Sequence, residues 1–132
     1  MNLQVLTDGS GLYAELSALE NNDVQTLNDI IHNHPNFPSL THVIIDLLNV
    51  DGLKLTAATL REVAAQDASA IANNPAFLLA IVARTEVVRG MADDYRSYLE
   101  SENEPPGWKV EVFESVQEAR FWIKQQAKKP AS

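Results

Sequence analysis

The 132-residue chain contains no cysteine, few cations and no long apolar run. Without a thiol it can form neither a disulfide framework nor a thiolate metal site, and it has no cysteine nucleophile. Ten Lys and Arg stand against 18 Asp and Glu, a formal net charge of −8. Nucleic-acid binding depends on clustered cations that neutralise phosphates. We therefore expect no nucleic-acid partner.

Membrane insertion and secretion are not expected either. The longest apolar run spans residues 76–83, whereas a membrane-spanning helix needs about 20 residues. The first eight residues have neither the cationic segment nor the following apolar segment of a secretory signal. The sequence therefore predicts a cytoplasmic protein that is not integral to a membrane.

The apolar pattern predicts short strands and amphipathic helices within one globular domain. Residues 3–7 and 12–17 alternate at period two around Asp8-Gly9-Ser10-Gly11, which predicts a β-hairpin. A helix is expected from Asn22 or Asp23 to His34, where Pro35 follows. Further strands are expected at residues 42–47, 77–83 and 108–113, and further helices after the capping residues Thr56, Thr85 and Ser115.

This order of elements, β-β-α-β-α-β-α-β-α, predicts the fold class. Successive strand-helix-strand units require right-handed crossovers and parallel strands, while the hairpin adds an antiparallel pair. We expect an α/β fold with a mixed, mostly parallel sheet covered by about four helices.

Catalytic and metal-binding patterns are not recognisable. The segment Gly9-Ser10-Gly11 lies between two expected strands and has no following helix, which favours a hairpin over a phosphate loop. His32 and His34 point in nearly opposite directions on a helix, and His34 is expected to be hydrogen-bonded and partly buried. His42 has no partner that the sequence identifies. We expect no enzymatic activity, no cofactor and no metal site.

The acidic residues divide into two groups. Asp93, Asp94 and the glutamates of residues 100–104 fit no calcium-loop spacing, so they indicate a solvated surface. Asp46 instead interrupts an apolar strand near its carboxyl end, where open α/β sheets place ligand-facing groups. The alternative is that the Asp46 carboxylate accepts backbone N–H bonds from the following loop.

Two stretches of the sequence resemble a known family. Residues 43–58 (VIIDLLNVDGLKLTAA) are similar to the central strand, Asp-Gly-Leu loop and helix start of the SpoIIAA-like branch of the STAS superfamily. Residues 112–123 (VFESVQEARFWI) are similar to that family's closing strand, capping turn and last helix. The founding members are bacterial anti-anti-sigma factors. The resemblance implies one STAS-like domain over residues 1–127, followed by a short basic tail over residues 128–132.

The resemblance also implies a regulatory role. In signalling STAS domains a kinase phosphorylates the second serine of an Asp-Ser-Ser-Gly motif. The ungapped equivalents are Lys54, Leu55, Thr56 and Ala57, so Thr56 alone keeps a hydroxyl. A phosphate on Thr56 would lie at a helix N-terminus, where the helix dipole favours an anion. A plain N-cap role explains Thr56 equally.

Two functions from different classes follow. The leading hypothesis is a non-enzymatic regulatory or adaptor domain that binds a protein partner through residues 48–60, with Asp46, Asp51, Gly52, Leu53, Lys54 and Leu55 as the candidate contact residues. The alternative is a small-molecule or lipid-binding module with a pocket at the Asp46 end of the sheet. The apolar loop residues Phe37, Leu40, Leu53 and Leu55 would line or gate that pocket. A symmetric homodimer is also a candidate assembly.

Overall fold

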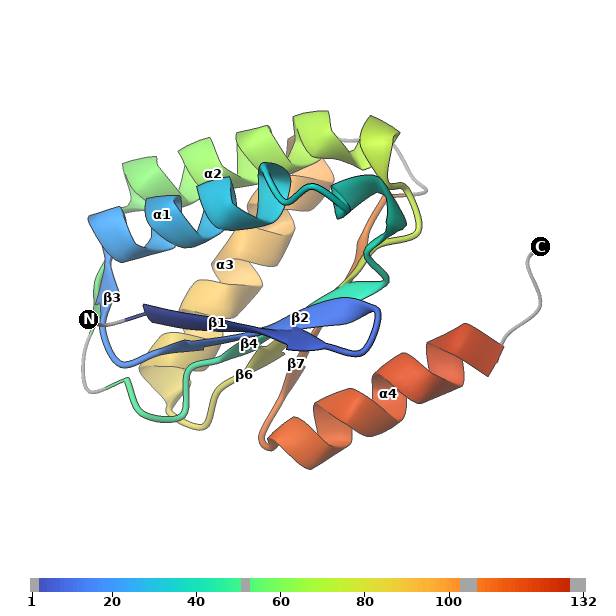
Figure 1. The fold of residues 1–132 in the computed structure, drawn as a ribbon. Coiled ribbons are helices and arrows are strands. Elements are labelled where there is room, and N and C mark those ends of the chain that lie inside the picture. Colours follow the sequence, from blue (N-terminus) through green and yellow to red (C-terminus); the bar gives the residue numbers. More distant parts are fainter. Residues whose placement is uncertain (1–2, 51–52, 103–106, 129–132) are drawn as a thin grey trace.

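A five-stranded sheet forms the centre of the protein. The computed structural model describes residues 3–50, 53–102 and 107–128. The sheet order is β1-β2-β4-β6-β7 (Figure 1). Its strands are β1 (Leu3–Asp8), β2 (Gly11–Leu16), β4 (His42–Asp46), β6 (Leu78–Val82) and β7 (Lys109–Phe113). β1 runs antiparallel to β2 and every other pair is parallel, so the expected mixed, mostly parallel sheet is confirmed.

Helices cover the two faces of this sheet unequally. Helices α1 (Asn21–His32), α2 (Ala57–Ala70) and α3 (Glu86–Glu102) lie on one face, and α4 (Val116–Lys128) lies on the other (Figure 1). Alternation along β4 divides the core accordingly, because successive side chains of a strand point to opposite faces. Val43 packs with the first three helices, and Ile44 packs with Ala119 of α4.

The structure also contains a second, two-stranded sheet that the sequence does not predict. It pairs β3 (Leu19–Glu20) in parallel with β5 (Leu53–Lys54). Each strand has only two residues, too few for a recognisable alternation of apolar and polar side chains. Two short 3₁₀ helices, η1 (Phe37–Ser39) and η2 (Ile71–Asn73), complete the described elements. Among the described residues, no helix combines the length and apolarity that a bilayer span requires.

Side-chain caps begin three of the helices where the sequence predicts them. The backbone N–H groups of Thr59, Val88 and Glu118 donate to the hydroxyls of Thr56, Thr85 and Ser115, at 3.2, 3.3 and 3.1 Å respectively. Helix α1 differs from the expectation. It begins at Asn21 and ends at His32, before the expected His34.

His34 lies in the turn after α1. Its Nδ1 accepts the backbone N–H of Asn36 at 3.0 Å, and the residue is partly buried, as the sequence predicts. The restriction that Pro35 places on the residue before it explains why the helix does not reach His34.

The hairpin packs tightly against the start of β4. Gly9 has a φ of 60° at the first central position of the turn, as a type II′ turn requires. Gly11 lies under the ring of His42, and a Cβ at Gly11 would come within 2.5 Å of that ring. His42 is buried, so its ring has little room to yield. The hairpin therefore requires glycine at position 11 for close approach rather than for backbone freedom.

Gly11→Ala should destabilise the fold by about 1–3 kcal/mol, because the new methyl group displaces the His42 ring. Urea denaturation would measure the change. Gly90→Ala is the matched control: Gly90 is exposed within α3 and a Cβ there meets nothing within 4 Å. That substitution should stabilise the protein by up to about 1 kcal/mol. Equal effects of the two substitutions would contradict the proposed contact with His42.

Candidate functional site

An apolar cavity of about 80 Å³ lies between the sheet and helices α1, α2 and α3. The five-stranded sheet contributes the side chains of Leu16, Val43, Ile45, Leu79 and Ile81. The three helices contribute Val24, Leu27, Asn28, Ile31, Leu60, Val63, Asp67, Met91 and Tyr95, β3 contributes Leu19, and connecting segments contribute Leu47, Leu55, Phe77 and Trp108. Aliphatic side chains form most of the wall, so the cavity suits apolar matter.

The cavity has a more accessible end and a buried end. Its partly buried wall residues are Val24, Ile45, Leu55 and Met91. Ile45 and Leu55 lie at and beyond the carboxyl end of β4, the edge at which α/β sheets usually place ligands. Phe77 and Trp108, which precede β6 and β7, are fully or nearly buried. We infer that the cavity is entered from the carboxyl edge of the parallel strands.

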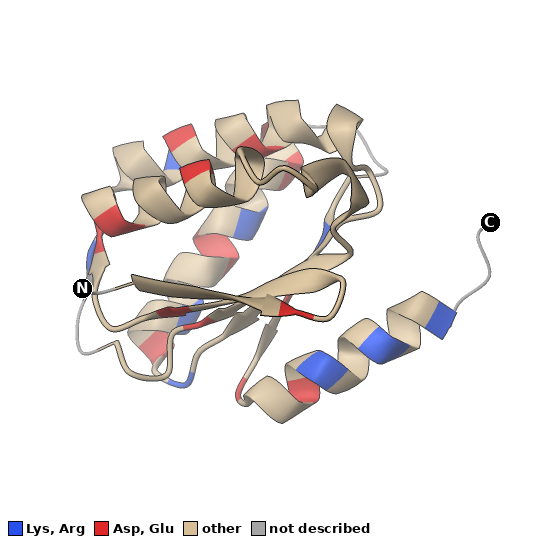
Figure 2. Ribbon diagram, in the orientation of Figure 1, with Lys and Arg blue, Asp and Glu red and all other residues tan. Residues whose placement is uncertain are grey.

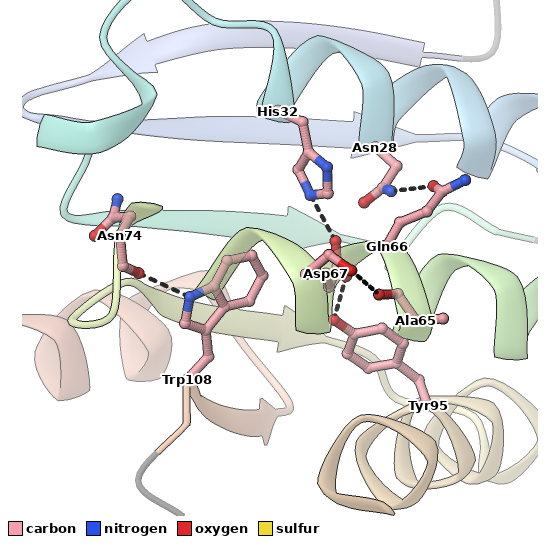
Figure 3. Close-up of polar contacts among 9 residues, drawn as sticks. Asn28, His32, Ala65, Gln66, Asp67, Asn74, Tyr95 and Trp108 are labelled. Atoms are coloured by element: carbon pink, nitrogen blue, oxygen red, sulfur yellow. Dashed lines mark hydrogen bonds and ion pairs between the residues drawn. The ribbon is translucent and has the colours of Figure 1, made fainter. Parts of the chain in front are cut away.

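A buried carboxylate lies at the inner end. The oxygens of Asp67 on α2 are bound by His32 of α1, with Nε2 to Oδ1 at 2.7 Å, and by the hydroxyl of Tyr95 on α3 (Figure 3). Burial and the adjacent Asp67 carboxylate raise the pKa of Tyr95 well above its ordinary value of 10.0. Tyr95 therefore stays protonated and donates its only hydroxyl hydrogen to Asp67.

The other polar groups of the wall also have protein partners. The Nδ2 of Asn28 donates to the Oε1 of Gln66 at 2.7 Å, which joins α1 to α2 (Figure 3). The indole N–H of Trp108 donates to the carbonyl of Asn74 at 2.8 Å. These bonds give the Asn28 amide and the Trp108 indole N–H partners within the protein, and no Lys or Arg is among the described wall residues.

Asp46 lies on the opposite face of the sheet from the cavity. Its Oδ1 accepts the backbone N–H of Leu48 at 3.0 Å, and its Oδ2 accepts the hydroxyl of Tyr13. Burial and this bond to Asp46 raise the pKa of Tyr13. The neighbours Ile45 and Leu47 line the cavity, but the Asp46 side chain does not. Asp46 therefore has the geometry of the alternative role, a carboxylate that accepts a backbone N–H from the following loop.

The remaining candidate contact residues do not share one environment in the structure. Asp51 and Gly52 lie outside the described residues, and Leu53 contributes its backbone to β5. The Lys54 side chain is 80% exposed and lies 3.8 Å from Glu20. Leu55 is partly buried and lines the cavity. The segment therefore divides between an exposed cation and a cavity residue.

Phe37 and Leu40 have a different location from the one the sequence suggests. Both are buried in the core rather than exposed on loops. Phe37 packs against Phe77 and Trp108, with ring centroids 5.7 and 6.3 Å apart. These two partners, rather than Phe37 or Leu40, form the cavity wall.

A second polar cluster joins the hairpin to β4 and α4. The imidazole of His42 lies 2.9 Å from Asp8 Oδ2 through Nε2 and 2.7 Å from Thr41 Oγ1 through Nδ1. Arg120 of α4 donates to the other oxygen of Asp8. Burial by itself would raise the pKa of Asp8, but the bonds from Arg120 and His42 outweigh it and hold that pKa below its ordinary value of 3.8.

The charged surface is uneven. Asp93 and Asp94 are exposed on α3, and Asp93 pairs with Arg96 at 3.0 Å. Figure 2 shows basic residues recurring along α4, where the sequence places Arg120, Lys124 and Lys128. Within the part of the chain that the structure describes, no group of three or more His, Asp or Glu side chains is placed to hold a metal ion.

Sequence reasoning missed the partners at the inner end of the cavity. Asp67 lies 35 residues from His32 and 28 from Tyr95, so no local spacing connects them. One signal was available. Asp67 shares a helix face with Val63 and Ala64, an apolar face on which an acid needs a buried partner.

Comparison with known proteins identifies the fold. No family profile matches the chain, and no curated protein sequence is detectably similar to it. A solved structure is similar: an uncharacterized protein from the DUF3478 family with a SpoIIAA-like fold, from Shewanella loihica PV-4. The TM-score is 0.55 over 92% of this chain and 91% of that chain, at 15% sequence identity. The chain has a SpoIIAA-like fold.

The SpoIIAA-like fold predicted from residues 43–58 and 112–123 is thereby confirmed. The structural match shows the architecture, and at 15% sequence identity it assigns no function to individual residues. The functional argument consequently depends on the cavity and on the exposed segment beside it.

The lowered pKa of Asp8 predicts a specific pH dependence. Asp8→Asn should reduce the free energy of unfolding at neutral pH by about 1–2 kcal/mol, because Arg120 and His42 lose their anionic partner. A carboxyl with a lowered folded-state pKa contributes stability above its unfolded pKa and loses it as pH falls further. The deficit should therefore shrink below pH 3.8.

Urea denaturation at a series of pH values would measure this deficit, with Asp29→Asn as the control because Asp29 is exposed on α1. A deficit that stays constant through the acid range would contradict the electrostatic explanation and indicate a steric one.

Proposed function

We propose that this protein binds a small apolar molecule, or the apolar end of a larger one, in the cavity between the sheet and helices α1 to α3. The observation that carries the proposal is the cavity itself, with its largely aliphatic wall. Folded interiors are normally packed as densely as organic crystals. A cavity of about 80 Å³ costs about 2 kcal/mol when it is fully enclosed, at about 24 cal/mol per Å³, so a ligand that fills this partly open one could recover up to that amount.

The volume limits the size of the ligand. Apolar cavities of about 150 Å³ stay dry and bind benzene or xenon. At about 80 Å³, this cavity suits a xenon atom or a short alkyl chain, and a longer ligand would extend past Leu55 and Val24 toward solvent. Each buried CH₂ contributes about 0.8 kcal/mol before the costs of association. We therefore expect weak, reversible binding.

Val63→Phe should abolish xenon binding. Val63 lines the cavity, so a phenyl ring there occupies the space that xenon needs. Xenon NMR and the shifts of cavity methyl groups would report binding, and thermal unfolding would show that the variant is folded. Val87→Phe is the matched control, since Val87 is 62% exposed on α3. Xenon shifts that are equal in Val63→Phe and the unsubstituted protein would refute the proposal.

A protein partner at residues 48–60 is the second candidate function. The observation that favours it is the exposed start of α2, where Thr56, Ala57 and Ala58 are accessible beside the exposed Lys54. Thr56 is an N-cap whose hydroxyl accepts the Thr59 N–H at 3.2 Å. Phosphorylation of Thr56 would regulate the binding of such a partner, because it adds negative charge to the surface at the helix N-terminus.

Lys54→Glu should weaken co-purification of this partner from the native cell by about tenfold, because the substitution reverses the exposed charge of the contact segment. Quantitative mass spectrometry after affinity capture would measure the loss. Lys124→Glu makes the same charge change on α4, across the sheet, and should leave capture unchanged. Equal capture by all three proteins would exclude the segment around Lys54 as the docking site.

A further inference from the structure

The inner end of the cavity carries the chemistry that would select a ligand. Two of its polar groups, Asp67 and Tyr95, are acceptors toward the cavity. Tyr95 donates its hydroxyl hydrogen to Asp67 and keeps an accepting oxygen. The carboxylate of Asp67 has no hydrogen of its own, and each oxygen can accept more than one bond.

The residues around Asp67 do not offset this excess of hydrogen-bond acceptors over donors. His32 contacts one carboxylate oxygen at 2.7 Å, but its ring is not part of the cavity wall. Asn28 offers both a donor and an acceptor, so its amide favours neither kind of ligand group. The described wall contains no Lys or Arg that could balance a bound anion. An anionic group inside would meet a carboxylate and lose its hydration, which is doubly unfavourable.

We propose that the cavity selects neutral apolar ligands that carry a hydrogen-bond donor, such as an alcohol, over carboxylates of the same length, and that Asp67 determines this preference. The inference rests on the proposed ligand-binding function. The ligand would enter from the Leu55 side with its hydroxyl leading, and the hydroxyl would donate to Asp67 or Tyr95. Its alkyl chain would then lie along the aliphatic wall.

Three five-carbon probes separate the possibilities: 1-pentanol, which donates; pentan-2-one, which only accepts; and pentanoate, which is anionic at about pH 7.5. Titrations followed by the methyl shifts of Leu27, Val63 and Ile81 would give the affinities. We expect 1-pentanol to bind at least about tenfold more tightly than pentan-2-one, and pentanoate to bind more weakly still. Equal or tighter binding of pentanoate at these methyl groups would overturn the inference while leaving the proposed function intact.

Two substitutions test the role of Asp67 itself. Asp67→Asn keeps the size and an accepting oxygen but removes the charge, so the preference for 1-pentanol over pentanoate should fall about tenfold or more. Asp94→Asn makes the same change on the exposed surface of α3 and should leave the preference unaltered. An equal effect of the two substitutions would assign the discrimination to the net charge of the protein instead.

Tyr95→Phe provides an independent measurement if Asp67→Asn does not fold. It removes the hydroxyl that donates to Asp67 Oδ2, so a buried carboxylate oxygen is left for the ligand's hydroxyl and the preference for 1-pentanol over pentan-2-one should widen. An unchanged difference would overturn the assignment of the donor site to this end of the cavity. If neither xenon nor any five-carbon probe shifts the cavity methyl groups, both the function and the selectivity proposed for it fail together.

Discussion

The buried carboxylate of Asp67 is the contact on which the three-helix layer depends. It lies on α2, and it binds His32 of α1 and Tyr95 of α3. An unpaired charge in this environment would cost several kcal/mol, so the helices cannot separate here without a large penalty. Asp67 and its partners His32 and Tyr95 also occupy positions between the helices that apolar side chains would otherwise fill. This end of the layer is consequently held in position, whereas the end near Leu55 and Val24 consists of partly buried aliphatic residues.

The sheet separates the cavity from the other polar features of the molecule. Because side chains alternate along a strand, β4 directs Val43 and Ile45 into the cavity and turns Ile44 and Asp46 toward the face of α4. The cluster of Asp8, His42 and Arg120 joins the hairpin and α4 on that second face. Asp46 stands near the carboxyl end of its strand, where α/β sheets usually place ligand-facing groups. It is nevertheless hydrogen-bonded to Tyr13 and to a backbone N–H of the following loop.

Much of the fold was predictable because its determinants are local. The strands alternate or run apolar over five or six residues, and each cap at Thr56, Thr85 and Ser115 lies within one turn of the N–H that it accepts. The two-residue strands β3 and β5 were missed because they are too short to show a period. The SpoIIAA-like fold could be inferred from residues 43–58 and 112–123, which carry a strand end, a loop and a helix start in a characteristic order. The candidate site was less accessible: Leu55 was named as a pocket residue, but Asp67 and Tyr95 were not.

The sequence alone determined the order of the elements, the mixed sheet, and the exclusion of thiol chemistry by the absence of cysteine. Tertiary structure alone decided which polar side chains meet. His32 reaches Asp67 across 35 residues, and His42 reaches Asp8 across 34, because chain crossings bring distant elements together. It also decided where the interior is incompletely filled. A cavity is the difference between the space that packed elements enclose and the volume of their side chains, and that difference depends on how layers fit together rather than on any local pattern.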